Sequence, residues 1–305
     1  MLGAFKRLAA KARDKLHREA IQGVSKAFPS YRFKSMRNEL YRVGSLPRHR
    51  AFDTRLLLPP IGLASPVAEA RNLEGRIVRA IDPGSYLGMY REIFEDEIYR
   101  FRTLSNSPYI VDCGANIGLS VIYFKSLYPA ARIIAFEPDP HVCELLESNM
   151  REFGLADVTL IRKGVWNSEG ILSFVADPEE GWGGHIAQES TSSKVNAVNV
   201  TRLRSYLVGH VDLLKLDIEG AECEVIADCA DLLRNVNHVF IEFHSFVRRA
   251  QCLGQLLSVL TEAGFRVHLH CCGARSRNPF IALESLPNGM DMQLNIFGVR
   301  NPEEG

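Results

Sequence analysis

The stretch "YIVDCGANIGLS", residues 109–120, joins an apolar run to a glycine-rich turn and decides the fold class. A short apolar run followed by Gly114 and Gly118 is typical of a buried strand that ends in a tight turn before a helix. Glycine lets a ligand approach the backbone, and a helix beginning at Ile117 would present free N–H groups to it. An ordinary strand–helix turn fits the same pattern, so the turn alone does not identify a ligand.

The pattern that begins at residue 109 recurs along the chain. Four further apolar runs follow at 133–136, 158–161, 211–216 and 239–243, and helical patterns separate most of them. Apolar runs with little alternation, spaced by helices, predict a parallel sheet that is covered on both faces. We therefore expect an α/β domain over residues 81–305, with a doubly wound, mostly parallel sheet and two final strands in "FRVHLHC" and "MQLNIFGV".

Two segments interrupt this regular pattern. "YREIFEDEIYRF" at residues 90–101 predicts a helix before the first strand. Residues 171–200 contain one strand pattern, "ILSFV", followed by "ADPEEGWGGHIAQESTSSK", which is loop by composition. Because a long loop inside a compact domain is often functional, we expect Trp182 and His185 to contact a substrate. A surface turn anchored by one aromatic side chain fits this loop equally well.

The N-terminal segment differs in charge from the rest of the chain. Residues 1–50 hold 13 Lys/Arg against 3 Asp/Glu, whereas the remaining residues hold 23 against 33. Apolar side chains recur at helical spacing over residues 2–28, which predicts a basic amphipathic helix. Such a helix packs on its own domain, mediates self-association, or lies on an anionic membrane as a peripheral anchor. Residues 45–85 are rich in Pro and Gly, so we expect a basic, partly helical extension at 1–80 with a short strand near 76–80.

Cysteine usage and the absence of long apolar segments indicate the compartment. The seven cysteines show no regular spacing, and their odd number favours reduced thiols. Charges interrupt the apolar residues at the N-terminus, so we expect no signal peptide, and no run of 18 apolar residues predicts a transmembrane helix. We expect a cytoplasmic protein that reaches a membrane only through its N-terminal helix. Nucleic-acid binding is disfavoured, because the basic excess lies in the extension without interleaved aromatic residues.

An acidic residue after the second strand indicates what the glycine turn binds. Glu137 follows Gly118 by 19 residues, and an acid at this place accepts hydrogen bonds from ribose hydroxyls. NAD is disfavoured because Asn116 replaces the central glycine of G-x-G-x-x-G and because Asp112 would repel a pyrophosphate. A carboxylate at Asp112 suits a cationic amino group instead. The residues therefore favour an adenosine that carries positive charge, as in S-adenosylmethionine.

Polar side chains end the fourth and fifth predicted strands. In "DLLKLDIEGAE" (212–222) and "IEFH" (241–244), residues two apart lie on the same face of each strand. The carboxyl ends of neighbouring parallel strands border one crevice, so we expect these side chains to meet there. A divalent metal held by the acids is the alternative, but no ligand spacing requires it and we predict none. The group comprises Lys215, Asp217, Glu219, Glu222, Glu242 and His244.

In this order and at these spacings, "VDCGANIG", "AFEPDP", "LLKLDIEGAE" and "IEFH" resemble the FkbM family of methyltransferases over roughly residues 80–270. The resemblance implies a class I methyltransferase fold, S-adenosylmethionine as methyl donor, and a hydroxyl of a small molecule or a sugar as acceptor. One departure is visible. An acid usual in the family before the fourth strand is absent from "VTRLRSYL", which contains Arg202 and Arg204 instead, so the substrate is expected to differ.

Methyl transfer to a hydroxyl requires a base, for which His244 is the first choice and Asp217 the second. Glu222 is expected to complement the helix dipole. His268, His270 and Cys272 share a strand face but lack a second ligand pair for a closed zinc site.

A nicotinamide-dependent oxidoreductase and a non-catalytic binding module remain the alternative functions. We expect catalytic side chains at Lys215, Asp217, Glu242 and His244, cofactor contacts at Asp112, Gly114, Ala115, Asn116, Gly118, Glu137, Pro138, Gly164 and Asp217, and substrate contacts at Trp182, His185 and Glu219.

Overall fold

A computed structural model of the chain describes residues 68–71, 76–175, 185–186, 195–273, 276–286 and 289–300. The predicted basic helix at residues 2–28 and the predicted substrate contact Trp182 lie outside these described residues. None of the helices in the described ranges has both the length and the apolar character that crossing a membrane requires.

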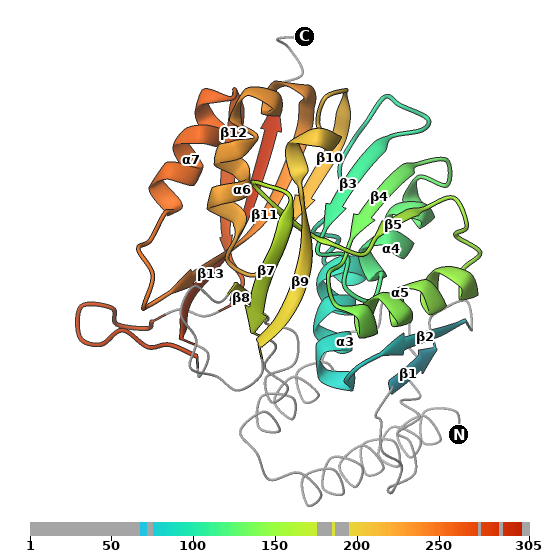
Figure 1. Cartoon of the computed structure of the whole chain (residues 1–305), viewed down its shortest axis with the longest axis horizontal. Coiled ribbons are helices and arrows are strands. Elements are labelled where there is room, and N and C mark those ends of the chain that lie inside the picture. The colour runs from blue at the N-terminus through green and yellow to red at the C-terminus, as the bar shows by residue number, and fades with distance from the viewer. Residues whose placement is uncertain are drawn as a thin grey trace, which may run out of the picture. The chain divides into compact units, whose positions relative to one another are not determined.

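A seven-stranded sheet forms the core of the described domain, with the strand order β12-β13-β11-β10-β3-β4-β5 (Figure 1). All neighbouring strands from β11 to β5 pair in parallel, whereas β13 runs antiparallel to both of its neighbours. The predicted α/β class with a largely parallel sheet is therefore confirmed. The order reverses between β3 and β10, which places a ligand crevice at their carboxyl ends. The strands are β3 (Tyr109–Cys113), β4 (Arg132–Phe136), β5 (Thr159–Ile161), β10 (Val211–Leu216), β11 (Val236–Phe246), β12 (Phe265–Cys271) and β13 (Met290–Arg300).

Side chains from helices cover both faces of this sheet. Ile241 of β11 is buried in one cluster with Val225 of α6. Phe240, the preceding residue of β11, points to the opposite face. There it packs edge-on against Tyr99, whose ring adjoins Phe124 of α4. The four helices that connect the strands are α4 (Leu119–Leu127), α5 (Pro140–Glu152), α6 (Glu222–Asp228) and α7 (Leu253–Glu262), and a 3₁₀-helix, Ala230–Asn235, follows α6.

The helical segment before β3 begins and ends earlier than the sequence predicts. α3 spans Pro83–Tyr90 and continues as a π-helical turn, Arg91–Glu95. Asp82 begins it, because its carboxylate accepts the N–H of Ser85 at 2.9 Å. Proline in the first turn of a helix is favourable, since the N–H that proline lacks would have no partner there. The helix expected over 90–101 is therefore wrong beyond residue 95.

A second, separate sheet has four strands in the order β6-β9-β7-β8. The sequence patterns predicted only β7 of these four strands. β9 follows the alternating pattern "VNAVNV", in which Val198 and Val200 are buried and Asn199 is exposed. This period of two residues is the signal for a half-buried strand. The strands are β6 (Gly164–Trp166), β7 (Gly170–Val175), β8 (His185–Ile186) and β9 (Val195–Arg202).

One buried asparagine ties a small hairpin to the main domain. β1 (Ala68–Arg71) pairs antiparallel with β2 (Ile77–Ala80), so the short strand expected near 76–80 is confirmed. Asn149 of α5 accepts the N–H of Arg79 at 2.7 Å and donates to the Arg79 carbonyl at 2.9 Å. It also donates to the carbonyl of Ile117 at 2.8 Å. Asn149 therefore joins β2, α5 and the glycine turn.

Two of the seven cysteines form a disulfide. Cys223 in the first turn of α6 is bonded to Cys252, the residue before α7. The prediction of reduced thiols is wrong for this pair. The two residues are separated by 29 positions, and only the packing of α6 beside α7 brings them together. Spacing along the sequence therefore gave no signal for the bond.

Replacing Asn149 by Ala is expected to lower the free energy of unfolding by on the order of 3 kcal/mol, because three buried backbone groups lose their partner. Urea denaturation followed by circular dichroism measures the loss. Glu144→Ala, on the exposed face of the same helix, is the matched control and should change stability by less than about 0.5 kcal/mol. Equal stability of the two variants would contradict the joining role of Asn149.

Candidate active site

The turn after β3 is held so closely against β10 that its first position must be glycine. Gly114 has φ +84, and a Cβ atom there would stand 1.9 Å from the carbonyl oxygen of Asp217. The N–H groups of Gly114 and Ala115 both donate to the carbonyl of Phe136, at 3.0 and 2.9 Å. Asn116 adopts φ 50, a left-handed value that is uncommon outside glycine but several-fold enriched for asparagine. The turn is thus fixed between the carboxyl ends of β4 and β10.

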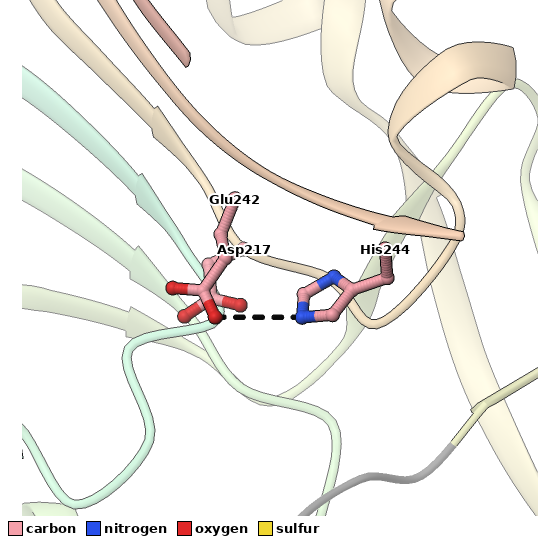
Figure 2. A group of neighbouring side chains, drawn as sticks. All are labelled: Asp217, Glu242 and His244. Carbon is pink, nitrogen blue, oxygen red and sulfur yellow. Dashed lines mark ion pairs between the residues drawn. The ribbon is translucent and has the colours of Figure 1, made fainter. Parts of the chain in front are cut away.

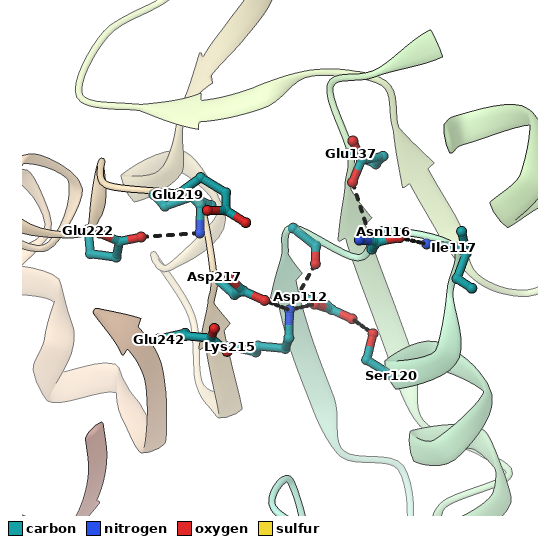
Figure 3. A network of polar contacts seen from close by, with 12 residues as sticks. Asp112, Asn116, Ile117, Ser120, Glu137, Lys215, Asp217, Glu219, Glu222 and Glu242 are labelled. Atoms are coloured by element: carbon teal, nitrogen blue, oxygen red, sulfur yellow. Dashed lines mark hydrogen bonds and ion pairs between the residues drawn. The ribbon is translucent and has the colours of Figure 1, made fainter. Parts of the chain in front are cut away.

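Glu137, which directly follows β4, closes this turn. Its carboxylate accepts the N–H of Asn116 at 3.0 Å (Figure 3). It also accepts the N–H of Asp139 at 3.0 Å. Burial raises the pKa of Glu137 to about 7, although these two donors act to lower it. A Cβ atom on Gly164 of β6 would lie 3.7 Å from Pro138, so these two residues also meet here. Glu137, Pro138 and Gly164, which were expected to contact an adenosine, therefore lie close to the glycine turn, at the carboxyl ends of β3 and β4.

A buried ion pair crosses from β10 to β3 beneath the turn (Figure 3). Lys215 lies opposite Asp112 in the parallel register, and its Nζ atom is 3.1 Å from Asp112 Oδ1. Lys215 also donates to the carbonyl of Gly114 at 2.9 Å, and Ser120 donates its hydroxyl to Asp112 at 2.5 Å. Burial alone would lower the pKa of Lys215, but Asp112 and Asp217 raise it, so the amine stays charged. Asp112 is fully buried, and its contact with a ligand stays a prediction.

Four carboxylates gather around His244 at the ends of β10 and β11. Its Nδ1 atom is 3.1 Å from Glu222 Oε1, and its Nε2 atom is 3.5 Å from Glu242 Oε1 and 3.6 Å from Glu219 Oε2. Asp217 completes the group, since one ligand atom each from Asp217, Glu242 and His244 lie within 4.8 Å of one another (Figure 2). Lys215 Nζ is 3.8 Å from Asp217 Oδ2. The structure thus brings together Lys215, Asp217, Glu242 and His244, as the strand pattern indicated.

The crowding of acids changes how this group ionises. Burial raises the pKa of Asp217 to about 7 and that of Glu219 to about 8. Burial would by itself lower the pKa of His244, but Glu219 and Glu222 raise it well above its usual value. The pKa of Glu242 is lowered: burial raises it, but the hydrogen bond and charge of His244 outweigh that effect. The cluster thus favours the protonated forms of Asp217 and Glu219 and the charged forms of Glu242 and His244.

The turn between β10 and α6 aims these carboxylates in different directions. Glu219 and Gly220 have φ values of 57 and 97, which reverse the chain after Asp217. Glu222 accepts the N–H of Gly220 at 2.9 Å while it also contacts His244. Its side chain and that of His244 are each 1% exposed, whereas those of Asp217 and Glu219 are 25% and 27% exposed. Glu222 therefore stabilises the turn before α6 and contacts His244, in addition to the expected interaction with the helix dipole.

A cavity beside His244 was not predicted from the sequence. Trp166 of β6, Phe246 and the arginines that follow β11 line it, together with Cys252 of the disulfide. The Arg249 guanidinium lies over the Phe246 ring, 5.1 Å from its centroid, and donates to the carbonyl of Gly220 at 3.3 Å. The sequence did contain a signal for this cavity. "SFVRRA" directly follows "IEFH", so the chain leaves the carboxyl end of β11 beside the predicted catalytic residues.

Histidines of β8 and β12 also stand out in the sequence. His185 lies in β8, but the structure describes only its backbone. Within the described ranges, His268, His270 and Cys272 do not form a group whose ligand atoms converge on one ion.

Comparisons with known proteins identify the relatives of this chain. The family described as "Methyltransferase FkbM domain" matches residues 112–267. Methyltransferase sdnD of Sordaria araneosa is 31% identical over 190 residues, which are 48% of this chain and 72% of sdnD. Hexuronic acid methyltransferase AglP of Haloferax volcanii is 28% identical, over 50% of this chain and 68% of AglP. The 31-O-demethyl-FK506 methyltransferase FkbM of Streptomyces tacrolimicus is 24% identical, over 67% of this chain and 91% of that protein.

Gly114→Ala is expected to lower the free energy of unfolding by more than about 4 kcal/mol, because the new methyl group would collide with the Asp217 carbonyl. Gly154→Ala is the matched control, since Gly154 also has a positive φ, +68, but no atom lies within 4 Å of the added Cβ. It should cost only the backbone strain, about 1–2 kcal/mol. Chemical denaturation of both variants tests the close approach, which similar losses would contradict.

Proposed function

The chain belongs to the FkbM family of methyltransferases, and we propose that it moves a methyl group from S-adenosylmethionine to a hydroxyl of a small molecule or sugar. One observation carries the proposal. The glycine turn with Glu137 and the cluster of acids around His244 lie side by side at the carboxyl ends of neighbouring strands, because Lys215 contacts both the Gly114 carbonyl and Asp217. A nucleoside site and a proton-accepting site therefore adjoin each other, as transfer to a hydroxyl requires.

The ends of β3 and β4 fit the donor. Each oxygen of Glu137 accepts one backbone N–H, which leaves lone pairs for the two hydroxyls of a ribose. When bound, the donor supplies a methyl group on a positively charged sulfur. The excess of carboxylates in the crevice favours a ligand of that charge.

We assign the acceptor to the cavity beside His244. Trp166, which is partly exposed, lines this cavity with a flat apolar surface on which a ring can pack. The name of one relative agrees with a hydroxyl acceptor, because it acts on a 31-O-demethyl compound, and the name of another agrees with a sugar acceptor, because it acts on a hexuronic acid. Arg202 and Arg204, which replace the acid usual in the family, pair with Asp228 and Asp231. We therefore expect the presence of these arginines, in place of an acid, to affect acceptor binding only indirectly.

Among the acids, Glu219 is best placed to take the proton of the acceptor hydroxyl. Its side chain is 27% exposed, and its φ of 57 is a strained value of the kind found at functional sites. Asp217 is 25% exposed but adjoins Lys215, and His244 is enclosed. A base within hydrogen-bond reach contributes about 10²–10⁴-fold to the rate. We therefore assign His244 to positioning, in place of the role of base that the sequence suggested.

Glu137→Ala is expected to weaken the binding of S-adenosylhomocysteine by at least about tenfold, because two hydrogen bonds to the ribose are lost. Titration calorimetry measures the affinity, and circular dichroism verifies the fold. Glu147→Ala, which removes a surface partner of Arg162, is the control and should bind normally. Unchanged affinity in Glu137→Ala would remove its nucleoside role. Binding of NAD without S-adenosylhomocysteine would favour the oxidoreductase alternative and overturn the proposed reaction.

Glu219→Gln is expected to lower turnover by about 10²-fold or more while the affinity for S-adenosylhomocysteine stays within about twofold, because a base acts on the proton in the transition state. Glu262→Gln, an exposed residue of α7, is the control for the loss of one acid. Turnover is measured with an acceptor found by screening sugars and hydroxylated small molecules. A fully active Glu219→Gln enzyme would show that another group of the cluster is the base.

A further inference from the structure

Asp217, which follows β10, and Glu242 and His244 of β11 bring one carboxylate or imidazole atom each close together (Figure 2). We propose that Asp217, Glu242 and His244 bind one divalent transition-metal ion, such as Mn²⁺, at the acceptor end of the crevice. The sequence analysis predicted no metal, because no short ligand motif is present. The ligands come instead from two strands that are neighbours only in the folded sheet.

The distances between the three side chains suit one ion. Their ligand atoms lie within 4.8 Å of one another, and His244 Nε2 is 3.5 Å from Glu242 Oε1. Around an ion with bonds of roughly 2.1 Å, neighbouring ligand atoms stand about 3–3.5 Å apart and opposite ones about 4.2 Å apart. Small side-chain rotations therefore complete the site. The backbone need not move, because the parallel pairing of Leu216 with Ile241 already sets the spacing of the strand ends.

His244 distinguishes this group from an ordinary acidic cluster. Its side chain is buried, and its Nδ1 atom lies 3.1 Å from the equally buried Glu222. A carboxylate on one ring nitrogen fixes the tautomer and presents the lone pair of the other, an arrangement typical of metal-binding histidines. Nε2 lies 3.5 Å from Glu242 and 3.6 Å from Glu219, beyond the usual 2.7–3.2 Å of a hydrogen bond. This nitrogen therefore points at two carboxylates across distances longer than those of an ordinary hydrogen bond.

The balance of charge also favours a cation. With every carboxylate ionised, negative groups would outnumber positive ones by three in this cluster even if His244 is protonated, and buried charge without compensation is costly. A divalent ion offsets most of that excess. The amide of Gln293 in β13 donates to Glu242, which orients this carboxylate as outer contacts orient metal ligands. The groups counted are Asp112, Asp217, Glu219, Glu222 and Glu242 against Lys215 and His244.

The ligand set indicates the kind of ion and what it does. One imidazole with two carboxylates suits Mn²⁺, Fe²⁺ or Zn²⁺ better than Ca²⁺, which prefers oxygen ligands alone. Three protein ligands leave positions open for oxygen atoms of the acceptor, whose hydroxyl pKa the ion would lower. Glu219 would then receive the proton beside the ion. This role in catalysis rests on the proposed function, whereas the binding of the ion does not.

The experiment measures metal binding without any turnover. The full chain is freed of metal with a chelator, dialysed, and titrated with Mn²⁺ while electron paramagnetic resonance follows the free ion. We expect one Mn²⁺ per chain with a micromolar dissociation constant, and modulation from an imidazole nitrogen in the spin-echo spectrum. The absence of stoichiometric binding by the wild-type chain would overturn the proposal, and this result depends on no variant.

Three variants locate the ion. Asp217→Asn and Glu242→Gln should each lower the affinity for Mn²⁺ at least about tenfold, and His244→Gln should abolish the nitrogen modulation. Glu144→Gln, an exposed acid of α5, is the matched control and should bind like the wild type. Circular dichroism verifies that each variant folds. Equal binding by the control and by folded Asp217→Asn would place the ion elsewhere and overturn the site.

S-adenosylhomocysteine, titrated in parallel, separates this inference from the proposed function. Binding of Mn²⁺ without binding of S-adenosylhomocysteine would leave the metal site standing and contradict the donor. The opposite result would leave the donor standing and overturn the metal site.

Discussion

The buried ion pair between Lys215 and Asp112 is the interaction on which the rest of the crevice depends. It lies where the strand order reverses, and it binds β10 to β3 through two side chains that water does not reach. Such a pair is tolerated only when further hydrogen bonds satisfy it, as Gly114 and Ser120 do here. Because Lys215 also holds the Gly114 carbonyl, the nucleoside turn and the acid cluster are set at a fixed spacing from each other.

The crevice divides into two halves with different physical characters. Around Glu137 the backbone supplies the donors, and the one carboxylate is held in place by N–H groups. Around His244 the contacts are between charged side chains, and their number exceeds what the local cations can neutralise. The first half suits recognition of a fixed shape. The second suits a reaction in which charge changes, because a group of coupled acids can redistribute protons at little cost.

Short-range patterns in the sequence predicted the central sheet, but they did not predict contacts between segments that are distant along the chain. β3, β4 and β10 are mostly apolar runs with little alternation, and a period of two puts Glu242 and His244 on one face of β11. The cysteine bond depends on the packing of α6 beside α7, which no short window contains, whereas α3 and β9 carry local signals, the Asp82 cap and the alternation of β9, that the sequence prediction missed. The role of His244 shows the same limit. Its residue type suggested a base, whereas its enclosure by four acids is a property of the folded chain alone.

The Cys223–Cys252 bond has a practical consequence for work on this protein. It fixes the start of α6, one residue after Glu222, to a wall of the cavity that we assign to the acceptor. Protein purified from a reducing expression host and protein recovered under air would differ in this one covalent link. Kinetic constants from two laboratories would then describe two chemical species, and the thiol content of each preparation belongs beside every rate that is published.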